Sequence, residues 1–250
     1  MMKFFRKIRQ KFFSENKFSK YLLYALGEIL LVVIGILIAI QVSNSNQVRI
    51  EQNTMNSYYT ELYTTLEADI KEQNESIDQL NALANDLMRC LEIINAKKED
   101  HIDEFKAKIG SLNTAYANDY SMELFDEFMN KGYLSKIEDP QLKRHFESVK
   151  IGLIRGKNWD EVLDSDYVNN VSPFIQQNLN YGDFNLPSWL FNENDRPKGG
   201  PKVDYSKLFH NLKVWNAIYG RLIYLKSTIK MNNGMLKALV ELRTALSEIS

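Results

Sequence analysis

The hydrophobic pattern along the chain changes once, near residue 43. Between Tyr21 and Val42 the sequence reads YLLYALGEILLVVIGILIAIQV and contains one charged residue, Glu28. These roughly 22 residues would rise about 33 Å as an α-helix, which matches a hydrocarbon core of about 30 Å. A cleaved signal peptide has a shorter apolar region of about 7 to 15 residues that ends in small residues. The pattern therefore predicts a single transmembrane helix over residues 21–42.

Beyond the span, apolar residues recur mostly in steps of three and four from about residue 47 to 96, which is the period of an amphipathic helix. They are Met55, Tyr59, Leu62, Leu66, Ile70, Ile77, Leu80, Leu83 or Ala84, Leu87, Leu91 and Ile94. Gln73 interrupts the series, and neither glycine nor proline occurs between Gly35 and Gly110. The pattern predicts a helix of about 50 residues, near 75 Å long. It could form a coiled-coil seam, but we favour packing against later helices of the same chain.

Four shorter helices are predicted in the middle of the chain, over residues 101–109, 121–130, 140–153 and 159–179. Gly110-Ser111 ends the first, and Ser121 is placed to cap the second. Gly132 fits the left-handed position that often follows a helix. Asp139-Pro140 combines a capping acid with proline at the first helical position, so a helix should start there. Pro173 should kink or split the fourth helix, because proline has no N–H to donate.

Residues 181–203 hold three of the five prolines and are predicted to form a loop. The loop also carries bulky apolar residues, namely Phe184, Leu186, Trp189, Leu190 and Phe191. Such residues either mark a binding surface or pin the loop onto the core, and we favour pinning.

A last helix is predicted from Asp204 to about Glu248, and Asn232-Asn233-Gly234 could bend or interrupt it. The residues expected to face the core are Leu208, Leu212, Trp215, Ile218 or Tyr219, Leu222, Leu225, Ile229, Leu236, Leu239 and Leu246. The expected fold class is all-α: a single N-terminal transmembrane helix, then an elongated extracytoplasmic helical bundle with two long helices. The expected domains are a tail over 1–20, the span over 21–42 and a helical domain over 43–250.

Basic residues gather before the span. Residues 1–20 contain seven basic side chains and one acidic side chain. By the positive-inside rule this tail lies in the cytoplasm, and the domain after the span lies on the far side of the membrane. Phe5, Ile8 and Phe12 share one helical face, so the tail is expected to lie on anionic lipid rather than to bind nucleic acid. The residues expected to contact the lipid surface are Lys3, Arg6, Lys7, Arg9 and Lys11.

One face of the predicted span carries a distinct set of residues, which we call the span stripe: Tyr24, Gly27, Glu28, Val32, Gly35 and Ala39. Gly35 and Ala39 form a small-xxx-small pair that permits close approach of another helix. An acid inside a span usually faces protein or water, because exposure to lipid is costly. The stripe is therefore a candidate helix–helix interface, although Glu28 could instead reach toward the cytoplasmic headgroups.

Candidate chemistry is sparse. The chain is 44% hydrophobic and 25% charged, so the part beyond the span should fold. Its single cysteine, Cys90, excludes an intramolecular disulfide and lies at helical spacing among apolar residues, as a buried thiol would. His101, His145 and His210 lie far apart, without partners at ligand spacing. No nucleophile elbow or phosphate-binding loop occurs, so no enzyme activity, cofactor or metal is expected.

Two stretches resemble a known family: ENKFSKYLLYALGEILLVVIGILIAIQVSNSN and LFDEFMNKGYLSKIEDPQLKRHFESV. They resemble a large group of single-pass membrane proteins from Bacteroidota, known only as a domain of unknown function. The membrane stretch, with Gly27, Glu28 and Gly35, is the more specific part. Family members commonly carry a tryptophan shortly after the span, which Asn44-Ser45-Asn46 lacks. The resemblance implies a bacterial inner membrane and a periplasmic domain, with no known catalytic residues.

These features favour a membrane-anchored interaction or scaffold protein. The expected partners are membrane lipids and either further copies of the chain or another protein. The alternative is a ligand-sensing domain that acts through its membrane helix on a separate output partner, because a basic tail of about 20 residues leaves no room for a cytoplasmic output domain. A third reading, an ion-conducting or proton-coupled subunit, rests on Glu28 alone.

Overall fold

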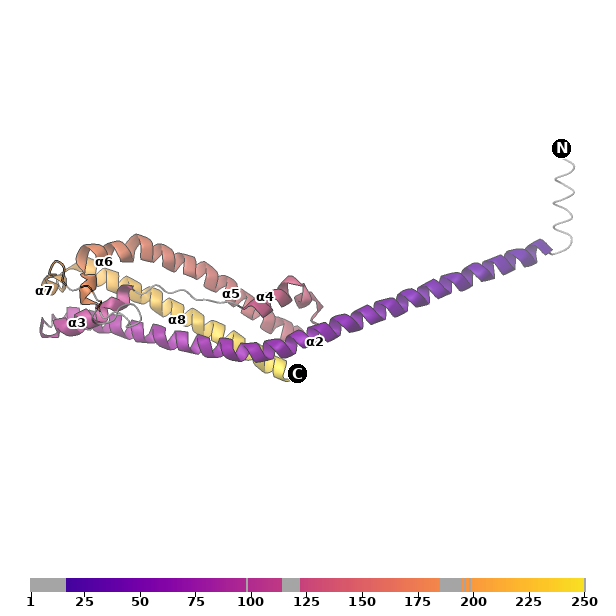
Figure 1. Cartoon of the computed structure of the whole chain (residues 1–250), viewed down its shortest axis with the longest axis horizontal. Helices are drawn as coiled ribbons and strands as arrows, with labels where there is room; N and C mark the ends of the chain where they lie inside the picture. The colour runs from indigo at the N-terminus through magenta and orange to yellow at the C-terminus, as the bar shows by residue number, and fades with distance from the viewer. Residues whose placement is uncertain are drawn as a thin grey trace, which may run out of the picture. The chain divides into compact units, whose positions relative to one another are not determined.

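A computed structural model of the chain describes residues 17–97, 99–113, 122–184, 195, 197 and 199–249. Every regular element within these ranges is helical, which confirms the predicted all-α class (Figure 1). The chain divides into two compact units, Met1–Ser57 and Tyr58–Ser250.

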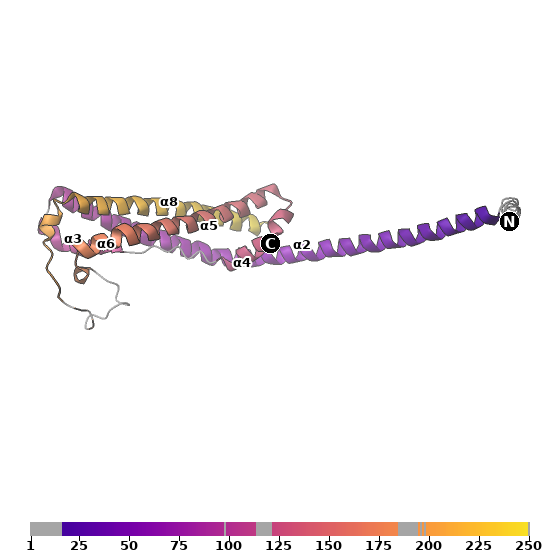
Figure 2. The same ribbon diagram turned by 90° about the horizontal axis from the view of Figure 1, so that it is seen from above.

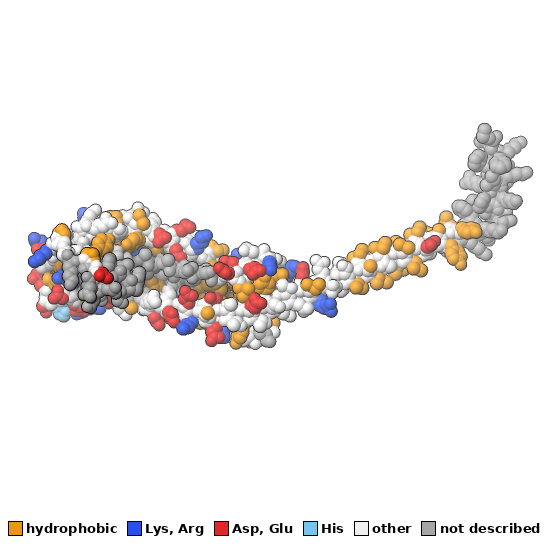
Figure 3. All heavy atoms as spheres, in the orientation of Figure 1, with side chains coloured by type: hydrophobic (Ala, Val, Ile, Leu, Met, Phe, Trp, Pro, Cys, Tyr) orange, Lys and Arg blue, Asp and Glu red, His pale blue; other side chains and the backbone are white. Residues whose placement is uncertain are grey.

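The first unit contains the beginning of helix α2 (Lys17–Ala96), which is 80 residues long. From residue 24 to 50 every side chain is exposed, and apolar side chains cover much of this stretch (Figure 3). Among the described residues, α2 is the one helix with a stretch long and apolar enough to cross a membrane, and the mean hydropathy of its apolar 18-residue window is 2.6.

Helix α2 does not end at the polar residues that follow the apolar run. Arg49 donates from Nη2 to Asn46 Oδ1 at 3.0 Å, and the Thr54 hydroxyl donates to the Ile50 carbonyl at 2.9 Å. Such local bonds are compatible with an α-helix, and neither glycine nor proline occurs between Gly35 and Gly110. The predicted helix beyond the span is confirmed, and it begins well before residue 47.

The second unit is built on three helices that lie side by side (Figures 1 and 2): the later part of α2, α5 (Pro140–Asp166) and α8 (Leu212–Ser247). Helix α5 continues past Leu153, where the sequence predicted its end. Gly156 lies buried within it, at a position where glycine costs about 1 kcal/mol of helix propensity. Packing against α8 outweighs that cost, so the two helices predicted over 140–153 and from Trp159 are one.

Helix ends marked by local chemistry are where the sequence predicted them. Asp139 accepts from the backbone N–H of Gln141 at 2.9 Å, and Pro140 follows as the first residue of α5. Gly132 has a φ of 75°, in the left-handed region, directly after α4 (Glu123–Asn130) and Lys131. Ser121, the predicted cap of α4, lies outside the described residues.

Helix α3 (Ile102–Ile109) begins one residue after the predicted start and ends at the predicted residue, but Gly110 does not break the chain's right-handed path. Its φ of −56° is helical, and the chain tightens into a 3₁₀ turn, Gly110–Asn113. The predicted disruption at Pro173 is confirmed. A π-helical turn, Tyr167–Val171, separates α5 from α6 (Ser172–Asn178), and Pro173 occupies the start of α6. A π-helical turn is wider than an α-helical turn, so it accommodates the N–H that Pro173 lacks.

The predicted helix from Asp204 is wrong at residues 209–211, where α7 (Tyr205–Leu208) ends before α8 begins. The Asn211 side chain accepts from the Lys213 N–H at 2.9 Å and so caps α8. The break moves Leu212 out of the core, and its side chain is 71% exposed. The spacing left two alternatives for the next core residue, Ile218 or Tyr219. Ile218 is buried and Tyr219 is exposed.

The predicted bend at Asn232-Asn233-Gly234 is absent, since α8 continues through it. The Asn232 side chain is fully buried, and the backbone carbonyl of Asn232 accepts a hydrogen bond from Gln73 Nε2 at 3.3 Å. Gln73, which interrupts the apolar series of α2, is thus buried against α8. Contacts between helices therefore keep this segment helical, although its sequence alone is typical of a turn.

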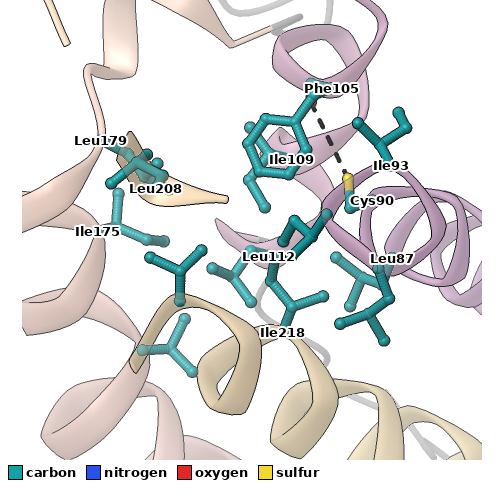
Figure 4. Close-up of a cluster of buried hydrophobic side chains, with 14 of the residues drawn as sticks. Leu87, Cys90, Ile93, Phe105, Ile109, Leu112, Ile175, Leu179, Leu208 and Ile218 are labelled. Atoms are coloured by element: carbon teal, nitrogen blue, oxygen red, sulfur yellow. Dashed lines mark hydrogen bonds between the residues drawn. The ribbon is translucent and has the colours of Figure 1, made fainter. Parts of the chain in front are cut away.

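The main core lies where α2, α3, α6, α7 and α8 meet (Figure 4). Leu87, Phe105, Ile175 and Ile218 belong to it, so the apolar face of α2 packs within the same chain, as favoured from the sequence. Cys90 is also buried there, and burial raises the pKa of its thiol, which keeps it protonated and unreactive.

A second cluster is aromatic and joins α2, α4 and α5. The rings of Phe128 and Phe146 stack with centroids 4.7 Å apart, and Tyr59 and Phe125 contact Phe146 as well. From the predicted loop, Phe184 is buried, which confirms pinning at this residue. Leu186, Trp189, Leu190 and Phe191 lie outside the described residues.

Candidate functional site

The span stripe lies on the exposed part of α2. Helical steps of three and four bring its residues onto one face, and Tyr24 is 83% and Val32 56% exposed. A side chain added at Gly27 or at Gly35 would meet no atom within 4 Å. Within the described first unit nothing packs on the stripe, so any group that covers it comes from outside that part of the chain.

A shallow hollow on this face is lined by Tyr24, Gly27, Glu28 and Leu31. The absent side chain at Gly27 opens the space beside the Glu28 carboxyl group. A carboxyl group in an apolar environment needs a hydrogen-bond partner or a proton. The hollow could therefore receive a polar group of another helix or a lipid headgroup.

The expected lipid-contact residues of the tail lie outside the described residues. They are Lys3, Arg6, Lys7, Arg9 and Lys11. Their role stays a prediction from charge and position.

The second unit contains a buried polar layer that was not predicted from the sequence. Arg221 is 1% exposed, and its Nη1 lies 3.4 Å from Asp166 Oδ2. Two helical turns away, Trp159 Nε1 donates to the Thr228 hydroxyl at 2.9 Å. Asn232 continues the same face of α8. The signal was present, because positions 221, 228 and 232 follow the three-and-four spacing of the apolar residues of α8.

This buried layer suits a structural role. Arg221 pairs with Asp166 through Nη1, although its buried Nε makes no hydrogen bond among the described residues, and Trp159 pairs with Thr228. A charge pair inside a bundle fixes which residues can lie opposite each other. The π-helical turn begins directly after Asp166. The layer therefore sets the register between α5 and α8.

Charged groups near the surface are also paired with one another. Arg89 binds Glu104 through two hydrogen bonds, at 2.7 and 2.9 Å, and His101 Nδ1 lies 2.9 Å from the same carboxylate. These bonds lower the pKa of Glu104 to about 2. The network joins α2 to α3 and leaves this carboxylate charged, unlike a general acid near neutral pH.

A tyrosine, an acid and a lysine form a second network between α2 and α4. The Tyr58 hydroxyl donates to Glu127 at 2.6 Å and accepts from Lys131 Nζ at 2.6 Å. Hydrogen bonding to Glu127 raises the pKa of Tyr58, whereas Lys131 lowers the pKa of Glu127. Neither shift prepares a group for proton transfer near pH 7.

No cluster of three or more potential metal ligands occurs among the described residues. His101 contacts Glu104, and His145 Nδ1 lies 3.8 Å from Glu241. These two histidines lie in different parts of the bundle, and each contacts a carboxylate of a neighbouring helix or turn.

No family model, curated protein or solved structure matches this chain. The resemblance to Bacteroidota membrane proteins rests on the two quoted stretches alone. The features of the chain that bear on function are the exposed apolar stretch of α2 and the polar pairs buried in the second unit.

Proposed function

We propose that the chain is a membrane-anchored interaction or scaffold protein that binds further copies of itself or another protein of the cell envelope. One observation carries the proposal: the apolar stretch of α2 is exposed from residue 24 to 42. Exposing this apolar surface to water would cost about 25 cal/mol of free energy for each Å². Lipid relieves that cost, and the span stripe offers a face for a second helix.

The proposed location is the bacterial inner membrane, with the N-terminus in the cytoplasm and the helical unit in the periplasm. Seven basic residues before the span and Arg49 as the first basic residue after it support this orientation. A single cysteine is compatible with a periplasmic location, because the second unit is stabilised by its own apolar core and not by a disulfide.

Labelling of introduced cysteines tests the orientation. In a Cys90→Ala background, cysteine at Asn44 should react with a membrane-impermeant maleimide in intact spheroplasts, whereas cysteine at Ser14 should react only after the membrane is opened. Unmodified protein serves as the control for the buried Cys90. The reverse pattern, or labelling of both sites in intact cells, would refute the proposed orientation.

Crosslinking tests the stripe. Single cysteines at Val32, Gly35 and Ala39 should form disulfide-linked species in native membranes, and cysteines on the opposite face, at Val33 and Leu37, should not. If all five positions react equally or none reacts, the stripe is not an interface between copies. Detergent extracts that contain only a lone monomer would further oppose a scaffold role.

A further inference from the structure

A groove runs along the surface between α5 and α8, with a volume of about 580 Å³. We call it the α5/α8 groove and define its floor by Gly152, Gly156, Met231, Gly234, Met235 and Ala238. The two helices lie side by side over its whole length (Figure 2). All of its lining residues belong to the second unit.

Small residues create the groove. A side chain at Gly152 would come within 2.6 Å of Met235 Sδ, so the helices approach closely there. At Gly234, in contrast, an added side chain would meet no atom within 4 Å. The floor is therefore apolar and open enough for another backbone to come near. Methionine is flexible and adapts its shape to an incoming apolar group.

The rim of the groove is mainly basic, with three cations and one acid, Glu241. Arg155 stands on the α5 side, and Lys230 and Lys237 stand on the α8 side. Lys237 has a weak, exposed pairing with Glu241 at 3.7 Å. Within the described part of the chain, Arg155 and Lys230 make no ion pair with a carboxylate, in contrast to Arg89, Lys108 and Lys131 elsewhere.

This basic character is local. The stretches 140–157 and 226–241 together hold eight basic and two acidic residues, whereas residues 58–250 as a whole hold 29 acidic and 23 basic residues. A basic strip on an acidic unit attracts an acidic partner and repels other copies of the acidic surface.

The spacing of the cations distinguishes a helix from a small anion. Lys230 and Lys237 are seven residues apart on one helix, which is two turns or about 10.5 Å. A single phosphate or lipid headgroup reaches one of them. A bound helix with acidic residues two turns apart reaches both, and another acid can reach Arg155 across the groove.

We propose that the α5/α8 groove binds an amphipathic α-helix of a partner protein. Its apolar side chains would lie on Met231, Met235 and Ala238, and its acidic side chains would meet Arg155, Lys230 and Lys237. An amphipathic helix in an apolar groove is a recurrent mode of recognition. The inference rests on the proposed interaction role and adds to it the chemical class of the partner.

A designed peptide tests the proposal on the full chain in nanodiscs of phosphatidylcholine. The probe is a fluorescent 18-residue helix with leucine along one face and glutamate beside it at seven-residue spacing, and its counterpart carries lysine in place of glutamate. Fluorescence anisotropy should show binding of the acidic peptide and at least tenfold weaker binding of the basic one. No binding, or equal binding of both peptides, would overturn the proposal.

Two variants identify the site. R155E/K230E should weaken binding of the acidic peptide at least tenfold, and Ile151→Asp, which changes a half-exposed residue at the groove, should weaken it severalfold. The matched control is K202E/K213E, which makes the same charge change at exposed positions far along the chain. An equal loss in the control would mean that overall charge attracts the peptide, and the proposal would fail.

Other occupants are separate outcomes. If nanodiscs containing phosphatidylglycerol displace the peptide from the wild-type groove, the groove binds anionic lipid, and the proposal is wrong. If R155E/K230E abolishes crosslinking between span cysteines, the groove contacts a second copy instead. Failure to bind the peptide with unchanged crosslinking would reject the groove partner and leave the proposed scaffold role standing.

Discussion

At the residue scale, the pair formed by Arg221 and Asp166 is the feature least expected from a bundle of apolar helices. Both side chains are buried, at 0% and 10% exposed. Removing water from two charges is costly, and only their pairing and further hydrogen bonds compensate for it. Each of the two charges is therefore stable in the core only while the other is present.

Arg221→Ala should destabilise the bundle by about 3 to 5 kcal/mol, because it leaves the Asp166 carboxylate buried without this counter-charge. Denaturant unfolding followed by circular dichroism measures the change. The double variant R221M/D166L should recover much of the loss. Arg155→Ala, at an exposed position of α5, is the control and should change stability by less than about 0.5 kcal/mol. An equal effect of R221A and R155A would contradict the structural role.

The Glu104 network predicts a pH dependence. Hydrogen bonds from Arg89 and His101 lower the pKa of Glu104 from its ordinary value of 4.5 to about 2. Its contribution to stability is therefore complete above pH 4.5 and is lost as the pH falls toward 2. The melting temperature of Glu104→Gln should lie below that of the wild type at pH 6, and the two should converge near pH 2. Curves that stay parallel across this range would show that the network contributes nothing.

At the element scale, replacing either of two glycines by alanine is expected to change stability in opposite directions. Gly132 has a φ of 75°, where a Cβ atom is strained by about 1 to 2 kcal/mol, so Gly132→Ala should destabilise by that amount. Gly220 lies inside α8 with nothing within 4 Å of an added side chain, so Gly220→Ala should stabilise by up to about 1 kcal/mol. Thermal unfolding of both variants checks the pair. A shift of the same sign in both would contradict this assignment of backbone conformation.

Element ends divide into those that sequence can predict and those that it cannot. Asp139-Pro140 and Gly132 act through hydrogen bonds and dihedral angles within a few residues, so local sequence predicts them. Gly156 and Asn232 remain inside helices because residues far along the chain pack against them. The break before Asn211 also escaped prediction, since apolar spacing alone continued across it.

The candidate site divides in the same way. Spacing on a single helix suffices to place Glu28, Gly35 and Ala39 on one face. The pairing of Arg221 with Asp166, and the meeting of Arg155 with Lys230 across a groove, require knowledge of which helices are neighbours. That knowledge is tertiary, and the periodicity of each helix does not contain it.

At the scale of the whole molecule, the last helix completes the core of the second unit. Buried residues of α8 contact α2 and α5 along its length, including Ile218, Leu225 and Asn232. A chain that ends at Asn211 should therefore lack a stable core. Limited proteolysis in membranes should cut this truncated chain rapidly between residues 58 and 166 and leave the full chain intact there. A chain that ends at Ser247 is the control, and equal resistance of the two truncations would contradict the prediction.

The hydrogen bond between Arg243 and the Tyr63 carbonyl joins residues 180 positions apart, and that between Gln73 and Asn232 spans 159. During synthesis, α2 leaves the ribosome long before the helix that buries its apolar face. At about 5 to 20 residues per second the wait lasts roughly 10 to 40 seconds. For that interval the newly made segment exposes apolar surface, so the nascent chain needs a chaperone or rapid helix pairing within its first half. The closing step of folding therefore waits for the synthesis of α8.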